Sequence, residues 1–67
     1  MKVWFVEDTD GQNHGYGLTE QQAQTFVMNN RGYDTFAECV SDGWAKPAVV
    51  IEVLEPVAQT LLNTCKA

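Results

Sequence analysis

Residues 2–18 read KVWFVEDTDGQNHGYGL, and this stretch decides the fold that we expect. Two runs that can form strands, residues 2–8 and 12–18, flank the turn that contains Asp10 and Gly11. An Asp-Gly pair in this setting is a strong signal for a two-residue hairpin turn of type I′, which needs positive φ at both central positions. The stretch therefore predicts two antiparallel strands joined by a tight turn.

Both faces of this hairpin carry apolar side chains. With a two-residue turn, residues that lie opposite each other share a face of the sheet. One face holds mostly large side chains: Val3, Phe5, Tyr16 and Leu18. The other holds Trp4 and Val6 beside two glycines, Gly15 and Gly17. We expect the helices and the core on the first face, which leaves an exposed indole on the second. An alternative stays open, in which the C-terminal helix folds across Trp4 and buries it.

Four further elements follow the hairpin. Thr19 and Thr35 each precede an apolar helical pattern at capping-box spacing, so we expect helices that end near Gly32 and Asp42. Residues 48–54 read AVVIEVL, a β-branched strand bounded by prolines. Glu55-Pro56 can begin a last helix. The sequence predicts one α+β domain over residues 1–67. Its three-stranded antiparallel or mixed sheet is packed by helices in the order β-β-α-α-β-α, with AVVIEVL beside the first strand.

Composition narrows the class of partner. The chain has 67 residues and a formal net charge of -5. A negative chain is repelled by phosphate backbones, so we expect no direct binding to nucleic acid, whereas a basic protein surface would attract it. No run approaches the about 20 apolar residues of a membrane span, and no targeting segment stands at the N-terminus. We expect a cytoplasmic protein in which Cys39 and Cys65 are reduced, small apolar residues.

The sequence offers little for catalysis. The only histidine, His14, lies opposite Glu7 near the hairpin tip, where an exposed cross-strand pair is the simpler interpretation than a catalytic dyad. A calcium-binding EF-hand loop requires glycine at its sixth position and glutamate at its twelfth. Counting from Asp8, these positions hold Asn13 and Thr19. Two cysteines and one histidine fall short of a structural zinc site. We therefore expect no enzyme, no metal and no cofactor.

One surface has the composition of a protein-binding site. Aromatic anchors dominate the affinity of such sites, and charge at their rim steers association. The candidate residues combine an apolar centre with an acidic rim: Trp4, Val6, Glu7, Asp8, Asp10, Val50 and Glu52. We expect a small acidic, non-catalytic module that inhibits or modulates a larger protein. Its size and charge are typical of phage-encoded inhibitors of host nucleic-acid machinery, such as anti-CRISPR proteins and RNA polymerase inhibitors, although no motif is shared.

A structural or assembly protein is the alternative. AVVIEVL carries a single charge, and an exposed edge strand of this kind is a template for pairing with another chain. The chain would then form a homodimer or larger homo-oligomer through its edge strands and the Trp4 face. A third hypothesis, a small-ligand or metal-ion sensor, would use Glu7, Asp8, Asp10 and His14.

Overall fold

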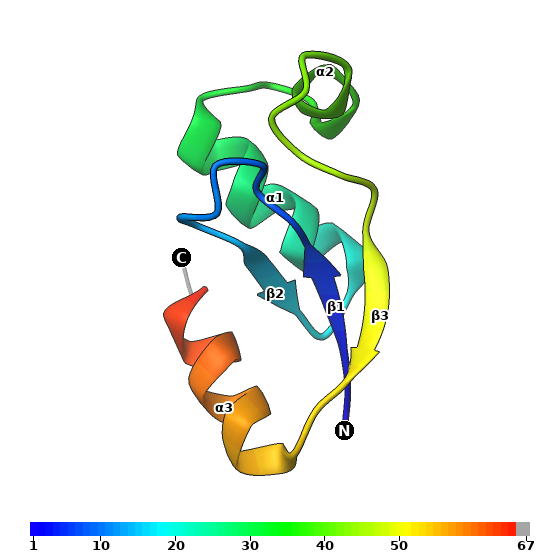
Figure 1. Ribbon diagram of the computed structural model, residues 1–67, viewed down its shortest axis with the longest axis vertical. Helices are drawn as coiled ribbons and strands as arrows, with labels where there is room; N and C mark the ends of the chain where they lie inside the picture. Colours follow the sequence, from blue (N-terminus) through cyan, green and yellow to red (C-terminus); the bar gives the residue numbers. More distant parts are fainter. Residues whose placement is uncertain (66–67) are drawn as a thin grey trace.

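The computed structural model describes residues 1–65 of the chain. Its six elements are β1 (Lys2–Val6), β2 (Gly15–Gly17), α1 (Glu20–Arg31), α2 (Phe36–Ser41), β3 (Val49–Glu52) and α3 (Glu55–Thr64). The three strands form one antiparallel sheet in the order β2-β1-β3. The α+β class, the element order and the place of the third strand beside the first are thus confirmed. Figure 1 shows α1 running behind β1 and α3 lying on the β2 side of the molecule.

The register of the hairpin is the one that the sequence predicts. Trp4 lies opposite Gly17, and Phe5 lies opposite Tyr16. On the other side of β1, Trp4 also faces Val50 of β3. Strand β1 is therefore central, and β2 and β3 are both edges of the sheet.

The turn itself differs from the prediction. The ladder stops at Val6 and Gly15, and the intervening residues form a loop. Gly11 has a φ of 73°, but Asp10 does not adopt positive φ, so the turn is not of type I′. The N–H of Gly11 donates to the carbonyl of Asp8 at 2.8 Å. Beyond Val6, Asp8 forms an isolated antiparallel bridge with Ala45, in the segment that leads to β3, on the side of β1 away from β2.

Helix α1 covers the face that was expected to be exposed. A Cβ atom at Gly15 would clash with the carbonyl oxygen of Ala23, and one at Gly17 would lie 2.6 Å from Cβ of Gln22. The two glycines let the helix backbone approach β2 directly. Val6, on the same face, has no exposed surface. The prediction that this face lacks a helix is wrong. Gly15 and Gly17 have no side chains, and here this allows α1 to pack closely on the sheet and does not leave an open surface.

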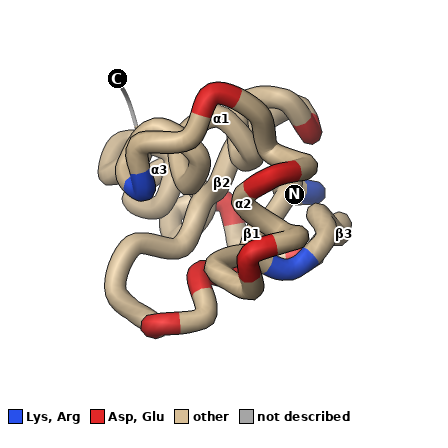
Figure 2. The backbone as a smooth tube through the Cα atoms, turned by 90° about the horizontal axis from the view of Figure 1, so that it is seen from above, with Lys and Arg blue, Asp and Glu red and all other residues tan. Residues whose placement is uncertain are grey.

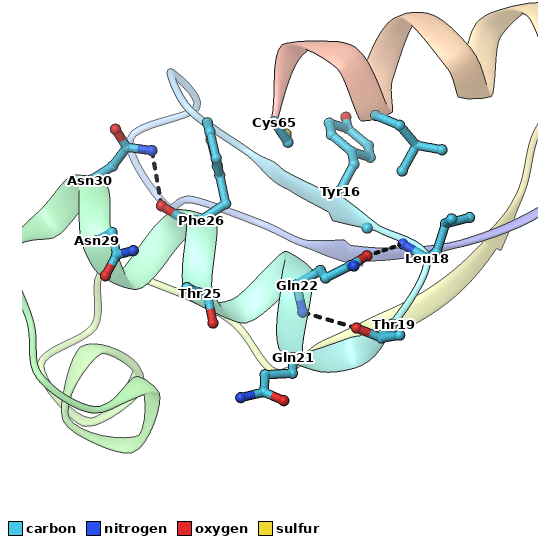
Figure 3. A pocket seen from close by; sticks show the side chains of 12 residues that line it. Tyr16, Leu18, Thr19, Gln21, Gln22, Thr25, Phe26, Asn29, Asn30 and Cys65 are labelled. Carbon is cyan, nitrogen blue, oxygen red and sulfur yellow. Dashed lines mark hydrogen bonds between the residues drawn. The ribbon is translucent and has the colours of Figure 1, made fainter. Parts of the chain in front are cut away.

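Helix α3 packs on the opposite side of the sheet. Val3 of β1 and Ala58 of α3 are both buried, and the ring of Tyr16 points toward α3 (Figure 3). The sheet therefore lies between two helices, and the expectation that helices cover one face only is wrong. Neither open alternative for Trp4 was correct: α1, and not the C-terminal helix, covers its face.

The helix ends follow the predicted caps. The hydroxyl of Thr19 accepts from the N–H of Gln22 at 3.2 Å, and that of Thr35 accepts from the N–H of Glu38 at 3.2 Å. Gly32 ends α1 in the left-handed conformation, with a φ of 75°. Within residues 1–65 no helix is both long and apolar enough to cross a bilayer.

Candidate functional site

The acidic side chains of the β1–β2 loop are held by Arg31, at the end of α1. Nη2 of Arg31 lies 2.5 Å from Oδ1 of Asp8 and 2.9 Å from Oδ2 of Asp10. The Asp8 carboxylate also accepts hydrogen bonds from the N–H groups of Asp10 and Asn13, at 3.2 and 3.4 Å. Only 3% of Asp8 is exposed. Asp8 therefore organises the loop and does not present a charge to a partner.

The environment of Asp8 favours its charged form. Burial alone raises the pKa of a carboxyl, but hydrogen bonds from Arg31, Asp10 and Asn13 outweigh it and hold the pKa of Asp8 below its ordinary 3.8. The carboxylates in turn raise the pKa of Arg31. The guanidinium also stacks over the ring of Trp44, 4.5 Å from its centroid. Arg31 thus ties the loop after β1 to the segment before β3.

The third acidic residue of the predicted rim is also paired. Oε2 of Glu7 lies 3.4 Å from Nζ of Lys46. The expected Glu7–His14 pair is wrong, because Nδ1 of His14 accepts from the backbone N–H of Asp8 at 3.0 Å. Figure 2 shows that the acidic residues are spread over loops and helices and are not gathered into one cluster.

The predicted apolar centre of the site is divided by the fold. Val6 is fully buried, and Trp4 is half-buried against the core formed by α1 and its neighbours. Neither residue offers the exposed anchor that the sequence suggested. Val50 and Glu52, in contrast, are exposed on β3. Of the predicted set, Val50 and Glu52 are therefore exposed on the surface, whereas the indole of Trp4 packs against the core.

Exposed aliphatic side chains surround β3 and the start of α3. Val49 and Val50 are 50% and 48% exposed, and Leu54 is 76% exposed. The full set, named here the aliphatic strip, comprises Val49, Val50, Leu54 and Val57. Because neighbouring strand residues point to opposite faces, the two valines flank the free edge of β3 from both sides.

A groove of about 780 Å³ lies at the opposite edge of the sheet. Its floor is the free edge of β2, and its walls belong to α1 and α3 (Figure 3). We name it the β2 groove; its lining residues are Tyr16, Gly17, Leu18, Thr19, Gln21, Gln22, Thr25, Phe26, Asn29, Asn30, Leu62 and Cys65. None of these side chains is acidic, basic or a histidine.

Two side chains cover backbone groups along the edge of β2. The thiol of Cys65 donates to the carbonyl of His14, with Sγ 3.5 Å from the oxygen. Burial raises the pKa of Cys65, and the N–H of Tyr16, which donates toward the same sulfur, offsets this only in part. At the other end, the N–H of Leu18 donates to Oε1 of Gln22 at 2.9 Å. Neither contact is predicted from the sequence, in which Cys65 is expected only as a small apolar residue.

Metal binding and disulfide formation find no support in the described part of the chain. Among residues 1–65 no three His, Cys, Asp or Glu side chains are placed to hold a metal ion. Cys39 is buried, Cys65 is half-buried, and both are free thiols. Burial raises the pKa of Cys39 as well, which makes a thiolate nucleophile unfavourable at either position.

Within residues 1–65, the aliphatic strip and the β2 groove are two surfaces open to a partner. Comparison of the chain with protein-family models, with curated proteins and with solved structures finds no match in any of the three.

Proposed function

We propose that this chain is a small, acidic, non-catalytic protein-binding module, which inhibits or modulates a larger protein through the open edge of β3. The observation that supports this function is the aliphatic strip. Four aliphatic side chains, each close to half exposed or more, lie on β3, just after it or at the start of α3.

The free edge of β3 supplies the backbone groups for binding. Strand β3 bonds to β1, and its N–H and C=O groups that point away from β1 have no strand beside them in the described part of the chain. Proteins usually protect such an edge with lysine, proline or inward-pointing charge. Here the only charged residue within the strand is Glu52, at its end. A partner strand added to this edge would gain main-chain hydrogen bonds and bury Val49 and Val50 on its two sides.

Charge favours a basic partner. The net charge of -5 attracts a positive protein surface and accelerates encounter. Such surfaces occur on proteins that handle nucleic acid, which fits a phage-type inhibitor of that machinery. Because Asp8 and Asp10 are engaged by Arg31, we expect the apolar contact at β3 to supply the affinity and the overall charge to supply the on-rate.

A second copy of the chain is the alternative occupant of the same edge. Two β3 strands can pair antiparallel about a two-fold axis, which would place each Val50 in the interface. This is the assembly function predicted from the sequence, without the Trp4 face. A homodimer would protect both edges and bury both aliphatic strips.

The variant Val50→Lys tests the proposal. Lysine in place of an exposed valine leaves the core intact and makes the edge unfavourable for pairing. Asn63→Lys is the matched control, because it adds the same charge at an exposed position of α3 outside the aliphatic strip. Both variants and the parent chain are analysed by sedimentation and by affinity capture from lysate of the native cell.

We expect the parent and Asn63→Lys to retain one and the same partner protein, and Val50→Lys to lose it. Concentration-dependent dimerisation of the pure parent, lost in Val50→Lys, would support the assembly function instead. A partner retained equally by all three chains, or a monomer that retains no partner, would refute the role of β3.

A further inference from the structure

Backbone groups along the free edge of β2 form hydrogen bonds with two side chains, at positions where a neighbouring strand would otherwise bond to them. In a strand, backbone groups of residues two apart point to the same side. The carbonyl of His14 accepts from the thiol of Cys65, and the N–H of Tyr16 points to the same side of the strand. Two residues further along, the N–H of Leu18 meets the amide oxygen of Gln22. The thiol and the amide thus stand where the peptide groups of an added strand would stand.

The Cys65 thiol and the Gln22 amide can both be displaced easily by the backbone of an added strand. A thiol is a weak donor and a weak acceptor, and the distance of 3.5 Å from Sγ to the His14 carbonyl is at the long end for a hydrogen bond. The Gln22 side chain lies at the exposed start of α1. A peptide N–H and C=O in their place would form stronger bonds with the same edge. The cost of freeing one thiol and one exposed amide is small by comparison.

The chemistry of the groove selects an uncharged occupant. Its twelve lining residues carry no charge, so a charged side chain entering it would lose hydration without gaining a partner. Phe26 of α1 and Leu62 of α3 supply apolar contact on the two walls. The amides of Gln21 and Asn29 supply hydrogen-bonding groups at the rim.

We propose that the β2 groove binds an uncharged, extended peptide segment of a partner protein, which pairs with the free edge of β2 as a fourth strand. This site is at the opposite edge of the sheet from β3 and does not depend on the function proposed above. A peptide fits better than a compact small molecule, because the groups on the floor are backbone groups repeated at the spacing of a strand.

The thiols of the intact chain report on occupancy. Cys65 lies in the groove and would be covered by a bound strand, whereas Cys39 is buried in the core and serves as an internal control. The probe is an acetylated and amidated peptide of alternating valine and threonine, about eight residues long, the upper range of common strand lengths. The matched control peptide has the same composition except for a central proline, which cannot continue the ladder.

At a probe concentration about ten times its Kd, we expect the alkylation rate of Cys65 to fall about tenfold. Cys39 stays unreactive in the folded protein with or without the probe, and the amide resonances of Tyr16 and Leu18 shift. The proline peptide has neither effect. In Cys65→Ala, which frees the edge, the probe binds about threefold to tenfold more tightly, as followed by the same two resonances.

Three results would overturn the proposal. One is the absence of any shift at Tyr16 and Leu18 with the probe at millimolar concentration. Another is equal binding of the proline peptide. The third is an equal effect of a neutral disaccharide such as trehalose, which would assign the groove to small polyhydroxylated ligands. The measurements on the parent chain decide the matter even if Cys65→Ala does not fold.

Discussion

Nη2 of Arg31 lies 2.5 Å from Oδ1 of Asp8, and this contact joins the last turn of α1 to the loop that follows β1. The same guanidinium stacks on Trp44, in the segment that leads to β3. Three parts of the chain that are distant in sequence therefore meet at one cation. Because Arg31 is the only arginine of the chain, no other side chain can provide this planar, branched donor.

Removing the Asp8 carboxylate should destabilise the protein far more than removing that of Asp10. Asp8→Ala leaves two backbone N–H groups and Arg31 without their acceptor, which costs about 1–3 kcal/mol in the free energy of unfolding. Asp10→Ala removes a half-exposed partner and costs less than about 1 kcal/mol. Urea denaturation followed by tryptophan fluorescence measures both. Equal losses would contradict the structural role of Asp8.

The contribution of Asp8 should disappear in acid. In the unfolded chain the pKa of Asp8 is near its ordinary value of 3.8, whereas in the folded protein the pKa is lowered. The folded state therefore binds this proton less readily, and stability falls as the pH drops. The contribution is complete above the unfolded pKa and is lost as the pH falls through the folded pKa. Urea midpoints from pH 7 to about pH 2 should converge between the parent and Asp8→Asn at the acid end. A constant gap across this range would show that Asp8 does not titrate as described.

Adding a methyl group at Gly15 should disturb the packing of α1 on the sheet. The Cβ of Gly15→Ala would meet the Ala23 carbonyl, so we expect a loss of about 3 kcal/mol, at the upper end of overpacking costs. Gly43 provides the control, because its Cβ position is open and only its φ of 85° opposes a side chain. Gly43→Ala should cost about 1 kcal/mol. Thermal and urea unfolding compare the two variants, and a smaller effect at Gly15 would argue against α1 on this face.

The two cysteines should differ in their reaction with iodoacetamide. Cys65 is half-buried and Cys39 is fully buried, and burial raises the pKa of each thiol. We expect slow alkylation of Cys65 in the folded protein at neutral pH, faster alkylation as the pH rises, and alkylation of Cys39 only in denaturant. Peptide mass spectrometry assigns the sites. Rapid labelling of Cys39 in the native protein would contradict the packing of α2.

The register of the sheet could be predicted from the sequence, but the covering of its faces could not. Alternation and turn length fix which residues lie opposite each other, so the pairing of Trp4 with Gly17 was predicted correctly even though the turn type was wrong. The face of Gly15 and Gly17 lacks side chains, and a count of apolar residues assigns it little burial. Its packing energy comes instead from the close approach of α1, which depends on tertiary structure.

Only the part of the candidate site that depends on a short stretch of sequence, the strand β3, could be predicted. AVVIEVL indicates an edge strand by its composition and its distance from the hairpin, and Val50 and Glu52 are exposed there. Asp8 and Arg31 are 23 residues apart, and no periodicity links them. A single arginine in an acidic chain was the available signal that one residue would gather several carboxylates. The contact of Cys65 with the β2 edge likewise joins residues that are 51 positions apart.

Photo-crosslinking at position 50 tests the binding role of β3 most directly. Val50 is replaced by benzoylphenylalanine in the full chain, and Asn63 is replaced in the same way as a control at an exposed site outside the aliphatic strip. Irradiation in native lysate should yield one specific adduct from position 50, a larger protein or a second copy as the mass decides, and none from position 63. Adducts of equal yield at both positions, or no adduct at position 50, would contradict the account.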